Sequence, residues 1–229
     1  MKKLLLALLI LPLFSFGQFS LRPTIGGGYG TVSQEGSLTQ NDIAGIFIQS
    51  AEVSAIYSLN NWYISMGIGY LATGYAYKMG NLTIGGFYPH EPATYLTNVK
   101  LIRKYEHLVV PVSFGRRVSF GKFSIQPEAG IDIAYNLSER SATRSDQNPN
   151  SDFHSNDRFS DDYKRLSFFA CVRVAPSYQL SDKLTVFCGP SYSYMLGSIV
   201  KQKTNSLTGA AISQTHQAIL LNAGLEVGL

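Results

Sequence analysis

Apolar and polar residues alternate along most of the chain. Between residues 123 and 137 the odd positions carry mainly apolar side chains such as Phe123 and Ile131, whereas the even positions are polar or small. The same alternation runs through residues 166–180 and 219–229. A period of two residues is typical of β-strands whose two faces meet different surroundings. These segments are longer than an average soluble strand of about 5–6 residues, and they suit the roughly 9–11 residues that a tilted strand needs to cross a membrane.

The alternation predicts about eight strands, joined by connections that are short and long in turn. The expected strands are residues 19–32, 46–59, 62–78, 106–118, 122–137, 164–180, 183–198 and 215–229. Tight turns are expected at residues 60–61, 120–121 and 181–183, and longer connections at 33–45, 79–105, 138–163 and 199–214. Short turns on one side and longer loops on the other are typical of outer-membrane barrels. We therefore predict an all-β fold, an eight-stranded antiparallel up-and-down transmembrane β-barrel.

The turns also predict strand register. A two-residue turn at 60–61 pairs Leu59 with Trp62, which explains why the apolar face moves from odd to even positions there. The turn at 181–183 keeps apolar residues on even positions and is expected to pair Leu180 with Leu184.

Aromatic residues on the apolar faces fall at two levels. One set lies near the short turns: Phe19, Tyr57, Trp62, Phe123 and Tyr178. A second set lies about eight to twelve residues further along the strands: Tyr29, Tyr70, Tyr135, Phe168, Tyr192 and Tyr194. Tilted strands would separate the two sets by about 20–30 Å, which matches the aromatic girdles of a membrane barrel.

The first residues have the pattern of an export signal. Lys2 and Lys3 precede an apolar run from Leu4 to Phe14, and Ser15 and Gly17 are the small residues that a signal peptidase requires. We expect residues 1–17 to be a signal peptide cleaved after Gly17, and residues 18–229 to be the outer-membrane barrel domain. The expected location is the outer membrane of the Gram-negative cell envelope.

Composition narrows the alternatives. The chain has 229 residues, of which 45% are hydrophobic and 15% are charged, against about 25% charged in a typical soluble domain. Its mean hydropathy of +0.03 is too low for a bundle of membrane helices. Two cysteines cannot form a disulfide framework, and a net charge of +4 does not indicate a nucleic-acid partner.

The last strand resembles the assembly signal of outer-membrane barrels. That pattern, polar-x-Gly-x-x-apolar-x-apolar, is matched by Asn222, Gly224, Val227 and Leu229, although the terminal position is usually aromatic. The resemblance implies recognition by the barrel-assembly machinery.

The whole chain is similar to the PorT-like outer-membrane β-barrel family. The segments that carry the similarity are the end of the leader at residues 16–18, the strand at 62–70 and the proline-centred strand at 105–112. This family has no shared catalytic residues. The resemblance implies a barrel of which some members are associated with protein secretion.

The inward positions predict a filled lumen, because a barrel of about eight strands is just wide enough to be filled by side chains. Bulky inward residues are Ile48, Ile56, Leu71, Tyr75, Val109, Phe169, Phe187 and Met195. Inward charges are Arg22, Glu52, Glu128, Asp132, Arg173 and Glu226, which we expect to form a structural charge network. Closure of the barrel predicts that Arg22 pairs with Glu226, and strand pairing predicts that Glu128 pairs with Arg173.

We find no pattern typical of an enzyme, a metal site or a cofactor site. His107 and His216 are expected to face the lumen, whereas His90 and His154 fall in loops without a convergent nucleophile and acid. The sequence thus predicts a non-enzymatic structural or partner-binding barrel, with a small solute or ion channel, and then a lipid-modifying enzyme, as the alternatives. The expected partners are outer-membrane lipid and lipopolysaccharide, the assembly machinery and an envelope or secretion protein, with the connection 138–163 as a contact surface. We expect a monomer.

Overall fold

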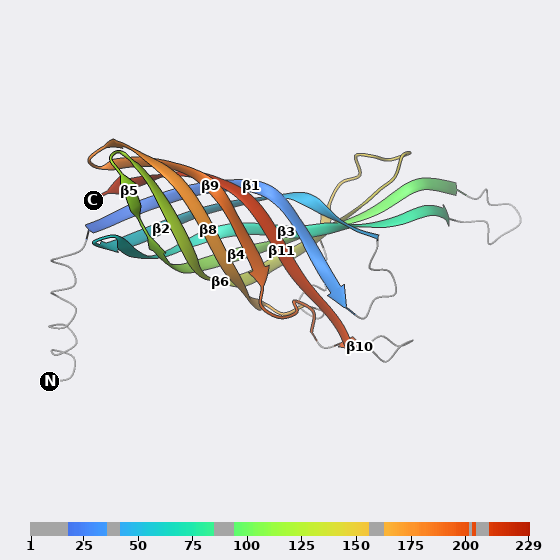
Figure 1. Cartoon of the computed structure of the whole chain (residues 1–229). Helices are drawn as coiled ribbons and strands as arrows, with labels where there is room; N and C mark the ends of the chain where they lie inside the picture. Colours follow the sequence, from blue (N-terminus) through green and yellow to red (C-terminus); the bar gives the residue numbers. More distant parts are fainter. Residues whose placement is uncertain (1–17, 36–41, 85–93, 156–162, 202, 205–210) are drawn as a thin grey trace, which may run out of the picture.

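The protein is built around an antiparallel β-sheet that closes into a ring (Figure 1). The residues that the computed structural model describes are 18–35, 42–84, 94–155, 163–201, 203–204 and 211–229. The expected leader and its cleavage site lie outside these residues, as does His90. None of the described residues form an α-helix that could span a membrane.

Eight long strands follow one another around the ring. They are β1 (Gln18–Glu35), β2 (Ile43–Leu59), β3 (Trp62–Ile84), β4 (Thr94–Arg116), β6 (Phe123–Arg144), β8 (Leu166–Ser181), β9 (Leu184–Met195) and β11 (Ala211–Gly228). Short strands pair with β6 and β11, and these are β5 (Val118–Phe120), β7 (His154–Ser155) and β10 (Lys203–Thr204). Since β11 also pairs with β1, the long strands close a barrel. The predicted eight-stranded up-and-down fold is confirmed.

The two faces of the wall differ in the way that the alternation predicts. Ile25 and Ile219 point outward and are 69% and 61% exposed, whereas Thr24 and Asn222 point inward and are buried. A soluble barrel would bury its apolar face, so this outer surface suits lipid rather than water. All of the bulky residues expected in the lumen are buried: Ile48, Ile56, Leu71, Tyr75, Val109, Phe169, Phe187 and Met195.

The short turns lie at the same end of the barrel as the C-terminus (Figure 1). Leu59 pairs with Trp62 as expected, and Asn60 adopts a positive φ of 55°, which asparagine tolerates well. The second turn is one residue later than predicted: Phe120 pairs with Phe123, because Gly121 supplies the positive φ of 67° that the turn needs.

The third turn also differs from the prediction. Ser181 rather than Leu180 pairs with Leu184, because an irregularity between Gln179 and Ser181 leaves Leu180 out of the ladder. The register further along is as expected, with Tyr178 opposite Val186. The turn is therefore tighter than the sequence suggests, without changing which residues face the lipid.

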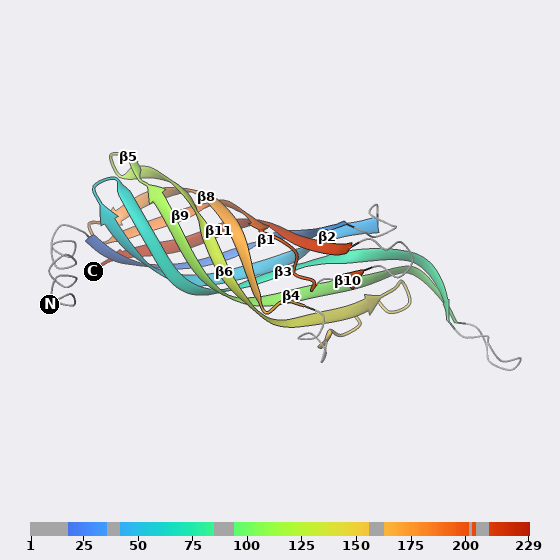
Figure 2. The same ribbon diagram turned by 90° about the horizontal axis from the view of Figure 1, so that it is seen from below.

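The strands on one side of the barrel are longer than predicted. Figure 2 shows β3 and β4 running on past the other strands, and both strands contain 23 residues. The expected loop at 79–105 is therefore mostly strand, and β6 continues to Arg144 rather than ending at residue 137. The alternation of polarity stops where the strands leave the apolar band, whereas backbone pairing continues, as Lys78 opposite Lys100 illustrates. The alternation of polarity therefore predicts the extent of the apolar band, but it does not predict where the strands end.

Candidate functional site: a filled lumen

Arg22 lies at the centre of a polar cluster in the half of the lumen nearer the short turns. Its side chain is 1% exposed, because β1 places it on the inward face. Nη1 donates to Glu128 Oε2 at 2.8 Å, and Nη2 donates to Gln126 Oε1 at 2.6 Å and to Glu226 Oε2 at 3.2 Å. The guanidinium also lies 5.2 Å from the ring centroids of Tyr63 and Phe187. Charge, hydrogen bonds and aromatic faces offset the loss of hydration at the two terminal nitrogens, whereas Nε is buried without a hydrogen-bond partner among the described residues.

Glu128 on β6 contacts Arg22 and residues of three further strands, β3, β4 and β8. Its Oε2 accepts a hydrogen bond from the Tyr63 hydroxyl at 3.0 Å, in addition to the bond from Arg22. Its Oε1 accepts from Ser113 Oγ at 2.7 Å and lies 3.6 Å from Arg173 Nη1. The expected pair of Glu128 with Arg173 is present, and the two residues are also directly opposite in the sheet.

Two further carboxylates extend this network. Glu52 on β2 accepts from both terminal guanidinium nitrogens of Arg173, at 3.1 and 3.0 Å. Glu226 on β11 accepts from Ser20 Oγ at 3.1 Å and from Arg117 Nη2 at 2.5 Å, besides Arg22. Such charge-assisted bonds are about twice as strong as neutral ones, which a buried charge requires. We call the connected set of Arg22, Glu52, Arg117, Glu128, Arg173 and Glu226 the lumen network.

Asp132 is the one predicted member that the described structure does not join to this network. Its direct partner in the sheet is the buried Phe169, so the carboxylate faces the lumen. It makes no ion pair or hydrogen bond with another described residue. Arg117 was not predicted, because it follows β4 at the short-turn end, where the alternation gives no signal.

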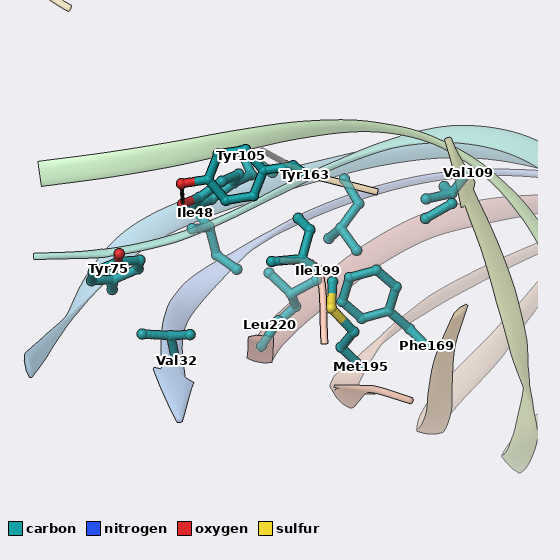
Figure 3. Packing of buried hydrophobic residues seen from close by; sticks show 14 of the residues in the cluster. Val32, Ile48, Tyr75, Tyr105, Val109, Tyr163, Phe169, Met195, Ile199 and Leu220 are labelled. Atoms are coloured by element: carbon teal, nitrogen blue, oxygen red, sulfur yellow. Dashed lines mark hydrogen bonds between the residues drawn. The ribbon is translucent and has the colours of Figure 1, made fainter. Parts of the chain in front are cut away.

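A cluster of buried apolar side chains lies in the other half of the lumen (Figure 3). This cluster includes Tyr75 on β3, Tyr105 on β4, Phe169 on β8 and Met195 on β9. Each of these side chains is at most 5% exposed. Tyr105 lies edge-on to Tyr163, with ring centroids 5.6 Å apart. We call this buried cluster the apolar layer: it consists of Val32, Ile48, Leu71, Ala72, Tyr75, Tyr105, Val109, Ala134, Tyr163, Phe169, Met195, Ile199, Val200, Ala218 and Leu220.

Part of the apolar layer comes from segments that the sequence placed in loops. Ile199 is fully buried and Val200 is 9% exposed, and Val200 forms a β-bridge with Tyr163. Ile199 N also donates a backbone hydrogen bond to Gln214 O at 2.9 Å. The adjacent apolar residues at 199 and 200, followed by the polar run from 201 to 206, were the available sequence signal.

The two lumen histidines are fully buried. His107 Nε2 lies 2.8 Å from Thr73 Oγ1, and His107 Nδ1 pairs with Asn136 Oδ1. This hydroxyl–imidazole–amide row has the order of a nucleophile relay, and the sequence did not suggest it. All three residues are 0% exposed, so no substrate reaches the hydroxyl in this conformation. His216 packs edge-on against Tyr105, with ring centroids 4.6 Å apart.

The described residues show neither a metal cluster nor a disulfide. They contain no group of three or more His, Cys, Asp or Glu side chains that could hold a metal ion. Cys171 and Cys188 are both free thiols.

The residues of the predicted assembly signal lie on the closing strand, β11, and at its end. Asn222 is buried and its Nδ2 donates to Ser191 Oγ at 2.7 Å, whereas Val227 and Leu229 are exposed on the outside. A Cβ atom on Gly224 would lie 2.3 Å from Pro23 O, so the seam between β1 and β11 requires glycine there.

A closed antiparallel barrel with an apolar outer surface is the architecture of transmembrane β-barrel proteins. No family model matches the chain, and no curated protein matches it.

Solved structures of outer-membrane proteins resemble it at low identity. Neisserial surface protein A is 13% identical, with a TM-score of 0.42 over 91% of this chain and 96% of that one. A major outer membrane protein from Thermus thermophilus is 12% identical, with a TM-score of 0.48 over 93% and 99%. The Escherichia coli Outer Membrane Protein W is 14% identical, with a TM-score of 0.42 over 92% and 97%.

Proposed function

We propose that the protein is a non-enzymatic integral barrel of the bacterial outer membrane, with a structural or partner-binding role and a lumen that does not conduct. The observation that carries this proposal is the filling of the lumen at two levels. Arg22 and its partners occupy the half nearer the short turns, and the apolar layer around Phe169 and Ile199 occupies the other half. Side chains that satisfy one another's charges and pack closely leave little room for a solute path.

Planar-bilayer recording of the purified barrel tests this proposal. We expect a quiet baseline with no stable conductance steps. Stable open channels of porin size would contradict it, and would favour the small-channel alternative. The feature that supports this alternative is Asp132, a lumen carboxylate without an ion-pair partner among the described residues, because lumen charges of that kind can serve an ion path.

The lipid-modifying enzyme is the weaker alternative. Only the row of Thr73, His107 and Asn136 supports it, and that row is buried. We expect neither the unmodified protein nor a Thr73→Val variant to hydrolyse or transfer acyl chains of outer-membrane lipids. Acyl transfer that depends on Thr73 would overturn the non-enzymatic proposal.

We further propose that the export signal is removed after Gly17 and that the long extramembrane strands meet an envelope or secretion protein, as the resemblance to the PorT-like family implies. The support is the projection of β3 and β4 beyond the other strands. Membrane fractionation with intact-mass measurement tests the location and the cleavage. Cross-linking at Tyr95, which is 69% exposed on the projection, tests the partner, with Lys122 at the opposite end as the control position.

A further inference from the structure

We propose that a cationic part of the outward face of β3, β4 and β6 binds the phosphate-bearing headgroups of lipopolysaccharide in the outer leaflet. This part lies beyond the upper aromatic level, which is the set of aromatic residues further from the short turns. This inference rests on the proposed location in the outer membrane and assigns residues to a partner class. The residues are Lys78, Lys100, Lys104 and Arg144, which we call the basic face.

The cations of the basic face are side by side on neighbouring strands. Lys78 on β3 is directly opposite Lys100 on β4, and Lys100 is directly opposite Arg144 on β6. Residues that are directly opposite point to the same face, and strands are about 4.8 Å apart, so three cations stand in one row about 10 Å wide. Like charges directly opposite one another are destabilising. A bound anion would relieve that repulsion.

The basic face continues the lipid-facing wall. Lys100 and Lys104 occupy even positions of β4, as does Leu108, which is exposed on the apolar outer surface, whereas Tyr105 at an odd position is buried in the lumen. Lys100 and Lys104 therefore point away from the barrel interior, and Lys78 and Arg144, which are opposite Lys100, share that face. The Arg144 guanidinium also lies 5.7 Å from the ring centroid of Phe153. A glycolipid that lies beside the barrel wall would contact these cations directly. A soluble ligand would not need cations that are placed next to the lipid-facing surface.

Their height matches the headgroup region. Leu108 is directly opposite both Tyr70 and Tyr135, which mark the upper aromatic level. Lys104 lies four residues further along β4, about 13 Å along the strand, and Lys100 another four. Lysine side chains extend toward a polar boundary. The ammonium groups are therefore expected at heights between the lipid phosphates and the sugars above them.

No described acid neutralises the basic face. Glu106, the carboxylate nearest along β4, pairs with Arg140 at 3.3 Å and accepts from Ser138 Oγ at 2.8 Å. None of the four cations forms an ion pair with a described residue. Arg144 Nε is buried and has no hydrogen-bond partner among the described residues. At the aromatic level itself, the outward residues of β9 and β11 are neutral: Tyr192, Tyr194 and Gln217.

The test is a titration of the full-length barrel, purified in a zwitterionic detergent, with lipopolysaccharide, followed by thermophoresis. The variant is K78Q/K100Q/K104Q/R144Q, and the matched control is K122Q/K183Q, which removes lysines at the short-turn end. Phosphatase-treated lipopolysaccharide, inorganic phosphate and heparin are the comparison ligands. Retention of the heat-resistant band on gels verifies folding, and K78Q/K100Q replaces the quadruple variant if that variant does not fold.

We expect the basic-face variant to bind lipopolysaccharide at least about tenfold more weakly, since charge-assisted contacts to phosphate are strong, and the control to bind normally. Phosphatase-treated lipopolysaccharide should bind the unmodified protein as weakly as native lipopolysaccharide binds the variant. Equal affinities of the variant and the unmodified protein would overturn the inference. Inorganic phosphate or heparin competing as effectively as lipopolysaccharide would also overturn it, because the ligand would then be a soluble anion. Failure of the unmodified barrel to float with lipid vesicles would contradict the membrane location itself.

Discussion

Arg22 and Glu128 form an ion pair across the lumen, with 2.8 Å between Nη1 and Oε2. Their strands, β1 and β6, are separated by three strands in either direction around the ring, so the pair joins opposite walls. Arg173 on β8 and Glu52 on β2 are related in the same way. The lumen network therefore ties the wall together across its diameter, in addition to the hydrogen bonds between neighbouring strands.

Replacing Glu128 by Ala should strongly destabilise the barrel. The change leaves Arg22 and Arg173 with fewer acidic partners in the lumen, and removing one partner of a buried pair costs about 3–5 kcal/mol. Urea titration of the barrel in detergent micelles measures the effect. The matched control is Asp132→Ala, on the same strand and the same face but without an ion-pair partner among the described residues, which should cost much less. Equal losses for the two variants would contradict the role of Glu128.

Arg173 and Glu52 should be energetically coupled. Their two guanidinium–carboxylate bonds predict that the Arg173→Gln and Glu52→Gln effects do not add, with a coupling energy of about 1–3 kcal/mol. The measurement is a double-mutant cycle on the free energy of unfolding in detergent. Additive effects would mean that the two side chains do not interact in the folded barrel.

Gly224 should be required for closure of the barrel between β1 and β11. A Cβ atom there would lie 2.3 Å from Pro23 O and 2.6 Å from Cζ of the Phe187 ring. Gly224→Val should therefore reduce the yield of heat-resistant barrel on refolding. Gly228→Ala on the same strand is the control, since its nearest contact would be an ordinary 3.6 Å to Lys183 Cα. Normal refolding of Gly224→Val would argue against the tight seam.

Ile199 and Val200 should stabilise the barrel from within the lumen. Truncating buried Ile199 to Ala should cost about 2–5 kcal/mol, with a further loss from Val200→Ala. Leu196→Ala, in the same connection but 49% exposed, should change the unfolding free energy by less than about 1 kcal/mol. The apolar layer would be in doubt if Ile199→Ala were as mild as Leu196→Ala.

The sequence predicted the contacts between neighbouring strands better than those across the lumen. Alternation and turn parity fix which residues face inward and which are opposite, so the pairs of Arg22 with Glu226 and of Glu128 with Arg173 could be predicted. The contacts of Arg22 with Glu128 and of Arg173 with Glu52 depend on the diameter of the closed ring and on side-chain reach. A strand-by-strand pattern does not contain that information.

The alternation of apolar and polar residues also could not predict two other features. These are the ends of the strands and the filling of the lumen by residues of the connections. Backbone pairing in β3 and β4 continues into water, where neither face has to be apolar, so the predicted loop at 79–105 was wrong. Ile199 enters the lumen from the non-strand residues 196–199 that follow β9, where a two-residue period gives no information. Such contacts arise from tertiary packing and not from local preference.

The membrane-spanning barrel is tested most directly by measuring whether the side chain at position 188 is surrounded by lipid or by water. Cys188 is exposed on the outer face of β9. A nitroxide label is attached to Cys188 in a Cys171→Ser background, with the barrel reconstituted in lipid vesicles, and its relaxation by oxygen and by a water-soluble nickel chelate is compared. A label at Lys122→Cys, in a C171S/C188S background, reports the short-turn end. The account predicts that oxygen relaxes the label at position 188 and the chelate does not, with the opposite result at position 122. Strong relaxation of the label at position 188 by the nickel chelate would show that the apolar face meets water, and would contradict a membrane-spanning barrel.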